Sequence, residues 1–189
     1  MKSSVVIKLS AAVSVIFLCG CFPRANWKKD YDYKSLRTFA VAGLDSPENY
    51  ASAGGAVRDM ISRYLIESGL RVVDAKVFDK MLENTDPKSD KLFAQIGILA
   101  GADAIIDGSV FRCQEEKEER VYYTGSDGKI GYETAFYNAK VDITLRLIDV
   151  KTGEVVWVNS DSYESFDLGH TMESAVYTTM RPLKRLLTD

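Results

Sequence analysis

The sequence has 189 residues, of which 46% are hydrophobic and 27% are charged, and its formal net charge is −3. A chain of this length and composition is long enough for one domain with a substantial hydrophobic core. The slight excess of acidic residues gives no support to a nucleic-acid partner, because such partners are bound by clustered lysine and arginine.

The first twenty residues have the order of a secretion signal. Lysines at Lys2 and Lys8 precede an apolar run from Leu9 to Leu18, and this order is typical of a signal peptide. The run is too short to cross a bilayer as a helix, which takes about 20 residues. We therefore expect residues 1–20 to be removed, which takes away two lysines and no acidic residue and leaves a formal charge of −5.

The end of this segment resembles the lipobox of bacterial lipoprotein precursors. It reads Leu18-Cys19-Gly20-Cys21, with a leucine three positions before a cysteine and a small residue directly before it. Cys19 stands where that family more often has Ala, Ser or Thr. The resemblance implies that Cys21 becomes the lipid-bearing first residue of the mature protein. The alternative is an ordinary cleaved signal that leaves Cys21 as a free thiol.

The residues after Cys21 bear on the membrane to which the protein would go. One acyl chain binds a membrane only marginally, whereas two or more hold a protein stably, and the lipobox resemblance implies more than one. Lipoproteins of this kind are retained at the inner membrane by residues such as aspartate after the cysteine, and Phe22-Pro23 provides none. We therefore expect a lipid anchor on the periplasmic face of the outer membrane.

The sequence offers little for catalysis or for metal binding. After Cys21 the chain has one cysteine, Cys113, which rules out an internal disulfide, and one histidine, His170, which we interpret as a surface residue. It has no G-x-S-x-G or H-E-x-x-H motif and no phosphate-binding glycine loop, and its acidic run at 115–119 is of the kind that is usually solvated. We expect no catalytic residue, no metal and no cofactor, and predict that the chain is not an enzyme.

The first part of the mature chain is predicted to alternate strands and helices. Apolar residues at helical spacing end at Gly69, which suits a helix C-terminus, and short apolar runs between turn residues indicate strands. The elements expected are a tether (21–35), a strand (36–44), a helix (51–68), a strand (70–75) and two helices (77–84 and 89–100).

The second part of the chain is predicted to contain a long antiparallel hairpin and a closing helix. Residues 137–150 alternate apolar and polar side chains, as in a half-buried strand, and Lys151-Thr152-Gly153 is a tight turn. Pro182 is expected to kink the closing helix or to end it early. The elements expected are a strand (102–113), an extended β-hairpin (113–138), two strands (137–150 and 154–163) and a helix (172–186).

Together these elements predict an α/β domain over residues 36–189, with a mixed sheet of about five strands covered by helices and one extended β-hairpin. Two stretches are more specific: LAGADAIIDGSV at 99–110 and VDITLRLIDVKTGEVVW at 141–157. They resemble the CsgG-type lipoprotein domain, which is related in fold to the TolB N-terminal domain and to the LpoB activators of penicillin-binding proteins. Gly101, Gly108 and Gly153 in these motifs are interpreted as structural residues.

The resemblance raises the question of a pore, because secretion pores of this family build a transmembrane barrel from two long hairpins. A spanning strand needs about 9–11 residues with every second one apolar. Between Cys113 and Thr124 both faces of the predicted strand carry charged residues, and the chain leaves no room for a second hairpin before the closing helix. We therefore expect no pore from this chain.

The 113–138 hairpin is instead predicted to be a soluble arm that turns near 125–128. Aromatic residues on an exposed hairpin are common interface anchors, and this one contains Tyr122, Tyr123, Tyr132, Phe136 and Tyr137. We predict that they bind an envelope protein partner. The alternative is a solvated hairpin whose aromatic side chains only pack across its own strands.

Two functions follow from these observations. The first is a non-catalytic lipoprotein anchored in the outer membrane that acts as an accessory in the secretion or assembly of cell-envelope components, with self-association into a homo-oligomer left open. The second is an LpoB-like activator of a peptidoglycan synthase. A tether over 21–35 would span at most about 50 Å, so a reach across the periplasm is marginal and the first function is favoured.

Overall fold

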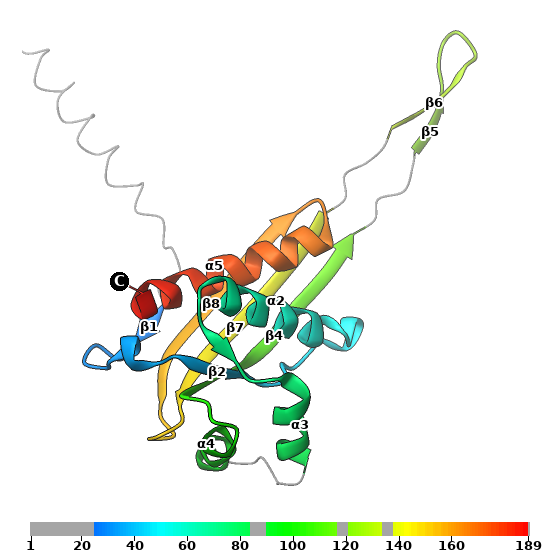
Figure 1. Cartoon of the computed structure of the whole chain (residues 1–189). Helices are drawn as coiled ribbons and strands as arrows, with labels where there is room; N and C mark the ends of the chain where they lie inside the picture. Colours follow the sequence, from blue (N-terminus) through cyan, green and yellow to red (C-terminus); the bar gives the residue numbers. More distant parts are fainter. Residues whose placement is uncertain (1–24, 84–89, 117–120, 134–137, 189) are drawn as a thin grey trace, which may run out of the picture.

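The computed structural model describes residues 25–188, except 84–89, 117–120 and 134–137, and it is α/β, as predicted (Figure 1). Its elements in chain order are β1 (Asn26–Trp27), η2 (Tyr33–Ser35), β2 (Thr38–Val41), η3 (Glu48–Tyr50), α2 (Ala53–Glu67), β3 (Arg71–Val72), α3 (Ala75–Glu83), α4 (Asp90–Leu99), β4 (Ala104–Glu116), β5 (Val121–Thr124), β6 (Ile130–Glu133), β7 (Asn138–Asp149), β8 (Val155–Ser165) and α5 (Leu168–Thr188), where η2 and η3 are 3₁₀ helices.

The main sheet has six strands in the order β1-β8-β7-β4-β2-β3. Strand β2 is parallel to both β3 and β4, and the other pairs are antiparallel, so the sheet is mixed as predicted. All five strands expected for it are present, and β1 is a sixth. The β4–β7 ladder runs from Ala104 opposite Asp149 to Glu116 opposite Asn138.

The larger core lies between one face of this sheet and the helices α2 and α5 (Figure 1). Alternate residues of β7 point into it, and all of them are buried: Ala139, Val141, Ile143, Leu145 and Leu147. Helix α2 contributes Val57, Ile61 and Leu65 at the predicted helical spacing. The buried face of the strand, formed by every second residue, and the buried face of the helix, formed by residues i, i+4 and i+8, therefore belong to one core.

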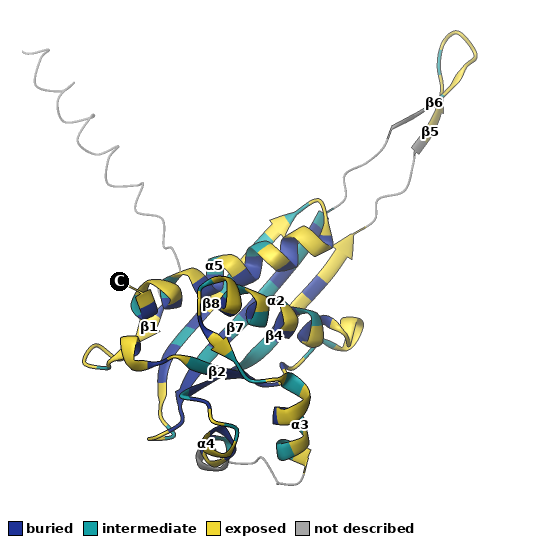
Figure 2. Cartoon of the chain, viewed as in Figure 1, coloured by how far each residue is buried: buried dark blue, intermediate teal, exposed yellow. Residues whose placement is uncertain are grey.

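A smaller core lies on the opposite face of the sheet, at one end only. Phe78 of α3 and Ile96 of α4 pack there with Ile105 and Ile148. Helix α3 begins at Ala75 rather than at Val77, because the Asp74 carboxylate accepts the backbone N–H groups of the first turn, as an N-cap residue does. Among the described residues no helix covers the rest of this sheet face, whose residues are of intermediate or exposed burial, as the teal and yellow bands along the long strands indicate (Figure 2).

The family-like motifs have the structural roles that the sequence suggested. Gly101 adopts a φ of +71° between α4 and β4, a conformation that favours glycine. At Gly108 an added Cβ atom would lie 2.1 Å from the carbonyl oxygen of Thr144 on β7. Only glycine permits this approach of the two central strands without displacing the backbone.

Helix α5 does not end early at Pro182, which was one of the two outcomes expected for this residue, but continues through it to Thr188. Leu183 and Leu187, which follow the proline, are both buried in the larger core. Burial of these side chains offsets the cost of the missing backbone hydrogen bond. None of the helices in the described part of the chain is long and apolar enough to span a membrane.

Candidate functional site

Residues 25–35, which we expected within the tether, are part of the folded domain, and we name them the strap. Strand β1 pairs with β8, placing Trp27 opposite Trp157, and the Lys28 backbone N–H donates to the Val156 carbonyl oxygen at 2.9 Å. Tyr33 is buried in the larger core, and its hydroxyl donates to the same carbonyl oxygen. The polar composition of residues 21–35 concealed this pairing, which depends on an edge that other parts of the chain create.

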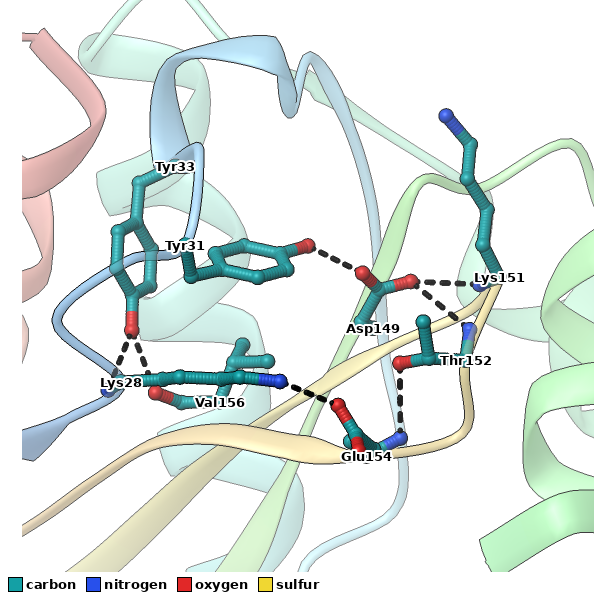
Figure 3. A network of polar contacts seen from close by, with 8 residues as sticks. All are labelled: Lys28, Tyr31, Tyr33, Asp149, Lys151, Thr152, Glu154 and Val156. Carbon is teal, nitrogen blue, oxygen red and sulfur yellow. Dashed lines mark hydrogen bonds and ion pairs between the residues drawn. The ribbon is translucent and has the colours of Figure 1, made fainter.

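A second set of contacts ties the strap to the turn between β7 and β8 (Figure 3). The Tyr31 hydroxyl donates to Oδ2 of Asp149 at 2.6 Å, while Oδ1 accepts the backbone N–H groups of Lys151 and Thr152. Burial of the Tyr31 ring, followed by its hydrogen bond to Asp149, raises the pKa of the Tyr31 hydroxyl well above its usual range. The neutral hydroxyl is therefore the form that holds the strap.

The third contact of this group is the ion pair between Lys28 and Glu154, with 2.7 Å between Nζ and Oε2. The hydrogen bond and the charge of Glu154 raise the pKa of Lys28. Both side chains are more than half exposed, so the pair contributes little to stability. The strap is held mainly by its strand pairing, by buried Tyr33 and by Tyr31.

The strap fixes how closely the domain follows the predicted lipidation site. Cys21 lies outside the described residues, and Ala25, the first described residue, is buried in the larger core. Ala25 is four residues after Cys21, and this segment spans at most about 14 Å when fully extended. The chain available as a tether is thus residues 21–24 and not residues 21–35.

The predicted hairpin is present as a separate two-stranded sheet of β5 and β6. Its turn is closed by the N–H of Gly125, which donates to the carbonyl oxygen of Lys129 at 2.7 Å, and Gly128 has a φ of +74°. Both features agree with the predicted turn at 125–128. The arm leaves the main sheet beyond Glu116 and Asn138, at the opposite end of the long strands from β1 (Figure 1).

The predicted partner-binding residues have different positions on this arm. Tyr122 and Tyr123 are 65% and 52% exposed, and the register sets Tyr122 opposite Tyr132. An added Cβ at Gly131 would lie 2.6 Å from the Tyr123 ring, so this ring packs on the opposite strand, as the alternative interpretation supposed. Phe136 and Tyr137 lie outside the described residues.

The uncovered part of the sheet carries a ladder of polar side chains that we did not single out in the sequence. The Arg146 Nε donates to Asp107 at 2.8 Å, and Arg112 lies 3.4 Å from Asp142. Further contacts in the ladder join Lys140 to Glu164, Asn138 to Glu164, Ser162 to Asp142 and Thr144 to Ser160. In the sequence, these positions appear only as polar residues that alternate with the buried residues of β7. The tertiary structure is needed to show that, in the described part of the chain, no helix covers them.

The one cysteine after Cys21 and the one histidine lie in different environments, and His170 is on the surface as predicted. Cys113 is 1% exposed, and burial, followed by the charge of Glu115, raises the pKa of its thiol. His170 is exposed in the first turn of α5, with its ring 6.5 Å from that of Tyr163. In the described part of the chain no three His, Cys, Asp or Glu residues form a group that could hold a metal ion.

Solved structures with the same fold include PelC from Paraburkholderia phytofirmans, crystallised as a dodecamer. It is 20% identical, with 86% of this chain and 98% of that chain covered and a TM-score of 0.53. Lipoprotein GNA1162 from Neisseria meningitidis is 17% identical, with 77% and 99% covered and a TM-score of 0.50. The LpoB C-terminal domain from Salmonella enterica is 11% identical, with 70% and 98% covered, and its TM-score is only 0.44. At these identities the likeness shows the fold alone.

The sequence comparisons identify the family. No curated protein matches the chain. The model of the family described as "Curli production assembly/transport component CsgG" matches residues 40–167. This match includes β4, β7 and β8, together with Gly101, Gly108 and the turn at Gly153. It covers well over half of the chain and agrees with the resemblance that the two motifs indicated, and the chain therefore belongs to the CsgG family.

Proposed function

We propose that this protein is a non-catalytic lipoprotein, anchored through Cys21 on the periplasmic face of the outer membrane, that acts as an accessory in the secretion or assembly of cell-envelope components. The observation that carries the proposal is the strap. It begins only four residues after Cys21 and joins the edge of the sheet through β1. A lipid on Cys21 would therefore hold the whole domain directly beneath the membrane.

The family supports the pathway part of this proposal. The matching family model is named for curli production, assembly and transport, and one of the similar structures, GNA1162, is itself called a lipoprotein. The lipobox of Leu18-Cys19-Gly20-Cys21 supplies the anchor. A role in the cell envelope is common to all three observations.

The strap also weighs against the alternative, an activator that reaches a peptidoglycan synthase. With residues 25–35 folded onto the domain, the tether spans at most about 14 Å and not the roughly 50 Å that residues 21–35 would span. Such a reach is too short for work at a distance from the membrane. The alternative would require release of the strap, against buried Tyr33 and the Tyr31–Asp149 hydrogen bond.

The anchor is tested by changing Cys21→Ser in the full-length protein and separating the membranes. We expect the variant to leave the outer-membrane fraction and to lack the acyl chains that mass spectrometry detects on the wild-type N-terminus. The matched control is Cys19→Ser, which keeps a small residue within the lipobox and should remain anchored. A Cys21→Ser protein that stays in the outer membrane would contradict the lipoprotein proposal.

The arm formed by β5 and β6 is proposed to bind the protein partner. An isolated two-stranded hairpin is marginally stable, and this one exposes Tyr122, Tyr123 and Ile130. A photo-crosslinking amino acid at position 122 should trap an envelope protein in intact cells, and the same group at Tyr50, on η3 of the main domain, should not. Adducts to lipid at position 122 would instead revive a pore-like role for the hairpin.

We also infer that the protein self-associates, since PelC, with the same fold, was crystallised as a dodecamer. The lipid-free mature protein should then sediment as a closed oligomer at micromolar concentration. A monomer at all concentrations, and in detergent when lipidated, would contradict this part of the proposal.

A further inference from the structure

Trp27 has an unusual position for a tryptophan. It lies on the edge strand β1 and is 48% exposed, whereas Trp157 opposite it on β8 is 1% exposed. Tryptophan combines a large apolar ring with an N–H group, and it is enriched where one side of a protein surface meets lipid and the other meets water. Exposed Val155, on the adjacent strand, shares a hollow with it.

Basic side chains line the same groove as Trp27, next to the end of α5. A shallow groove of about 330 Å³ is lined by Trp27, by Lys29 and Lys34 of the strap, and by Arg185 in the last turn of α5. The Asp32 carboxylate also lines it, and Asp30 is exposed nearby in sequence. The groove thus has three cations and one carboxylate, a composition that suits the phosphates of lipid headgroups.

The short segment between Cys21 and the first described residue limits how far the surface around Trp27 can lie from the membrane. Trp27 is six residues after Cys21, and the segment from Cys21 to Ala25 spans at most about 14 Å. If Cys21 carries lipid, its acyl chains insert into the hydrocarbon core of the leaflet that faces the periplasm, and Cys21 itself lies at the headgroup layer. A surface held this close to them faces the headgroup layer.

We propose that the patch of Trp27, Lys29, Lys34 and Arg185 docks on the phospholipid bilayer, with the Trp27 ring in the headgroup region. This inference rests on the proposed lipidation of Cys21. Because β1 and the hairpin lie at opposite ends of the long strands (Figure 1), docking at the patch points β5 and β6 away from the membrane. From Val158 to Ser165 alone, β8 rises about 23 Å. The lipid contact would thereby orient the arm toward its partner.

The test uses the lipidated full-length protein reconstituted in vesicles of phosphatidylethanolamine and phosphatidylglycerol. Brominated phospholipids in these vesicles quench tryptophan fluorescence on contact with the ring. We expect at least twofold greater quenching of the wild type than of Trp27→Phe, in which only buried Trp157 emits. Replacing Lys29, Lys34 and Arg185 together by glutamate should reduce the wild-type quenching at least twofold. Because all four positions are exposed, these variants are expected to fold.

A matched reporter at the far end tests the orientation. Ser126→Trp, made in the Trp27→Phe protein, places the only exposed tryptophan at the exposed tip of the hairpin, and it should not be quenched by the brominated lipids. Quenching at position 126 would overturn the proposed orientation. Protection of Trp27 from aqueous iodide without quenching by lipid would mean that another protein copy covers it, which would overturn the docking inference.

Flotation of the vesicles separates the two proposals. Protein that floats with the vesicles but shows equal quenching of the wild type and Trp27→Phe is anchored without docking, and only the further inference fails. Protein that does not float lacks the lipid anchor, and both proposals fail together.

Discussion

At the scale of single residues, Gly108 and Tyr31 show how two kinds of contact hold the domain together. Gly108 permits the backbones of β4 and β7 to approach where any side chain would collide with the carbonyl oxygen of Thr144. Tyr31 closes the strap over the β7–β8 turn through Asp149. The first contact belongs to the family motif, and the second belongs to the part of the chain that the family match does not reach.

Gly108→Ala is expected to lower the free energy of unfolding by about 3 kcal/mol or more, because the added Cβ would lie 2.1 Å from a backbone oxygen that cannot move independently of β7. Urea unfolding monitored by circular dichroism measures the change. Gly43→Ala is the matched control, since nothing lies within 4 Å of its added Cβ. Equal effects of the two substitutions would contradict the close approach.

Tyr31→Phe is expected to weaken the alkaline sensitivity of the fold. The pKa of Tyr31 is raised above the ordinary value of 10.0 in the folded state, so the unfolded chain loses this proton first as pH rises. The contribution of Tyr31 is complete below about pH 10 and is lost as pH rises above it. Between about pH 9 and pH 11, wild-type stability should fall more steeply than that of Tyr31→Phe. Tyr50→Phe, on the exposed η3, should retain the wild-type slope.

At the scale of elements, tertiary packing modifies what local sequence suggests. Residues 25–35 form a strand and a 3₁₀ helix despite their polar composition, since β8 offers an edge to pair with and the core offers a site for Tyr33. Helix α5 passes through Pro182 for a similar reason. Its buried residues on both sides of the proline belong to one continuous core.

Pro182→Ala is expected to raise the free energy of unfolding by about 1–3 kcal/mol, because alanine restores a backbone donor and removes the ring from the helix interior. Thermal unfolding of the lipid-free protein measures the gain. Arg181→Ala, at the exposed neighbouring position, should change stability by less than about 0.5 kcal/mol. A loss of stability in Pro182→Ala would mean that the core is adapted to the proline ring.

At the scale of the whole molecule, the two candidate functional parts are attached to opposite ends of the long strands. The strap and the patch around Trp27 lie near the β8 residues Trp157 and Val158, and the arm follows Glu116 of β4. The strap is part of the larger core, whereas β5 and β6 form a sheet of their own. We therefore expect the strap to be required for the fold and the arm to be an appendage that the fold does not need.

Replacing residues 117–137 by a two-residue Asn-Gly turn should leave the free energy of unfolding within about 1 kcal/mol of the wild type, because the β4–β7 ladder already extends to Glu116 and Asn138. Crosslinking to the envelope partner should be lost. In comparison, Tyr33→Ala in the strap should cost about 3 kcal/mol or more, since its ring is buried and its hydroxyl is hydrogen-bonded. Unfolding of the shortened chain would contradict the appendage interpretation.

The sequence by itself determined the order of strands and helices, the five main strands and the hairpin turn. These features depend on local patterns: the alternation in residues 137–150, the helical spacing in 51–68, and glycines such as Gly101 and Gly128 that adopt positive φ. The family also followed from two short motifs whose glycines serve the fold. The signal segment and the lipid on Cys21 stay predictions from the sequence.

Only the tertiary structure decided that the strap is folded, that α5 continues past Pro182, and which face of β7 stays open. Each depends on contacts between residues far apart in the chain, such as Trp27 with Trp157, Tyr31 with Asp149 and Arg146 with Asp107. A polar segment looks the same in a sequence whether or not a distant strand offers it an edge. That edge shortens the predicted tether on Cys21 to four residues and brings Trp27 close to the proposed membrane surface.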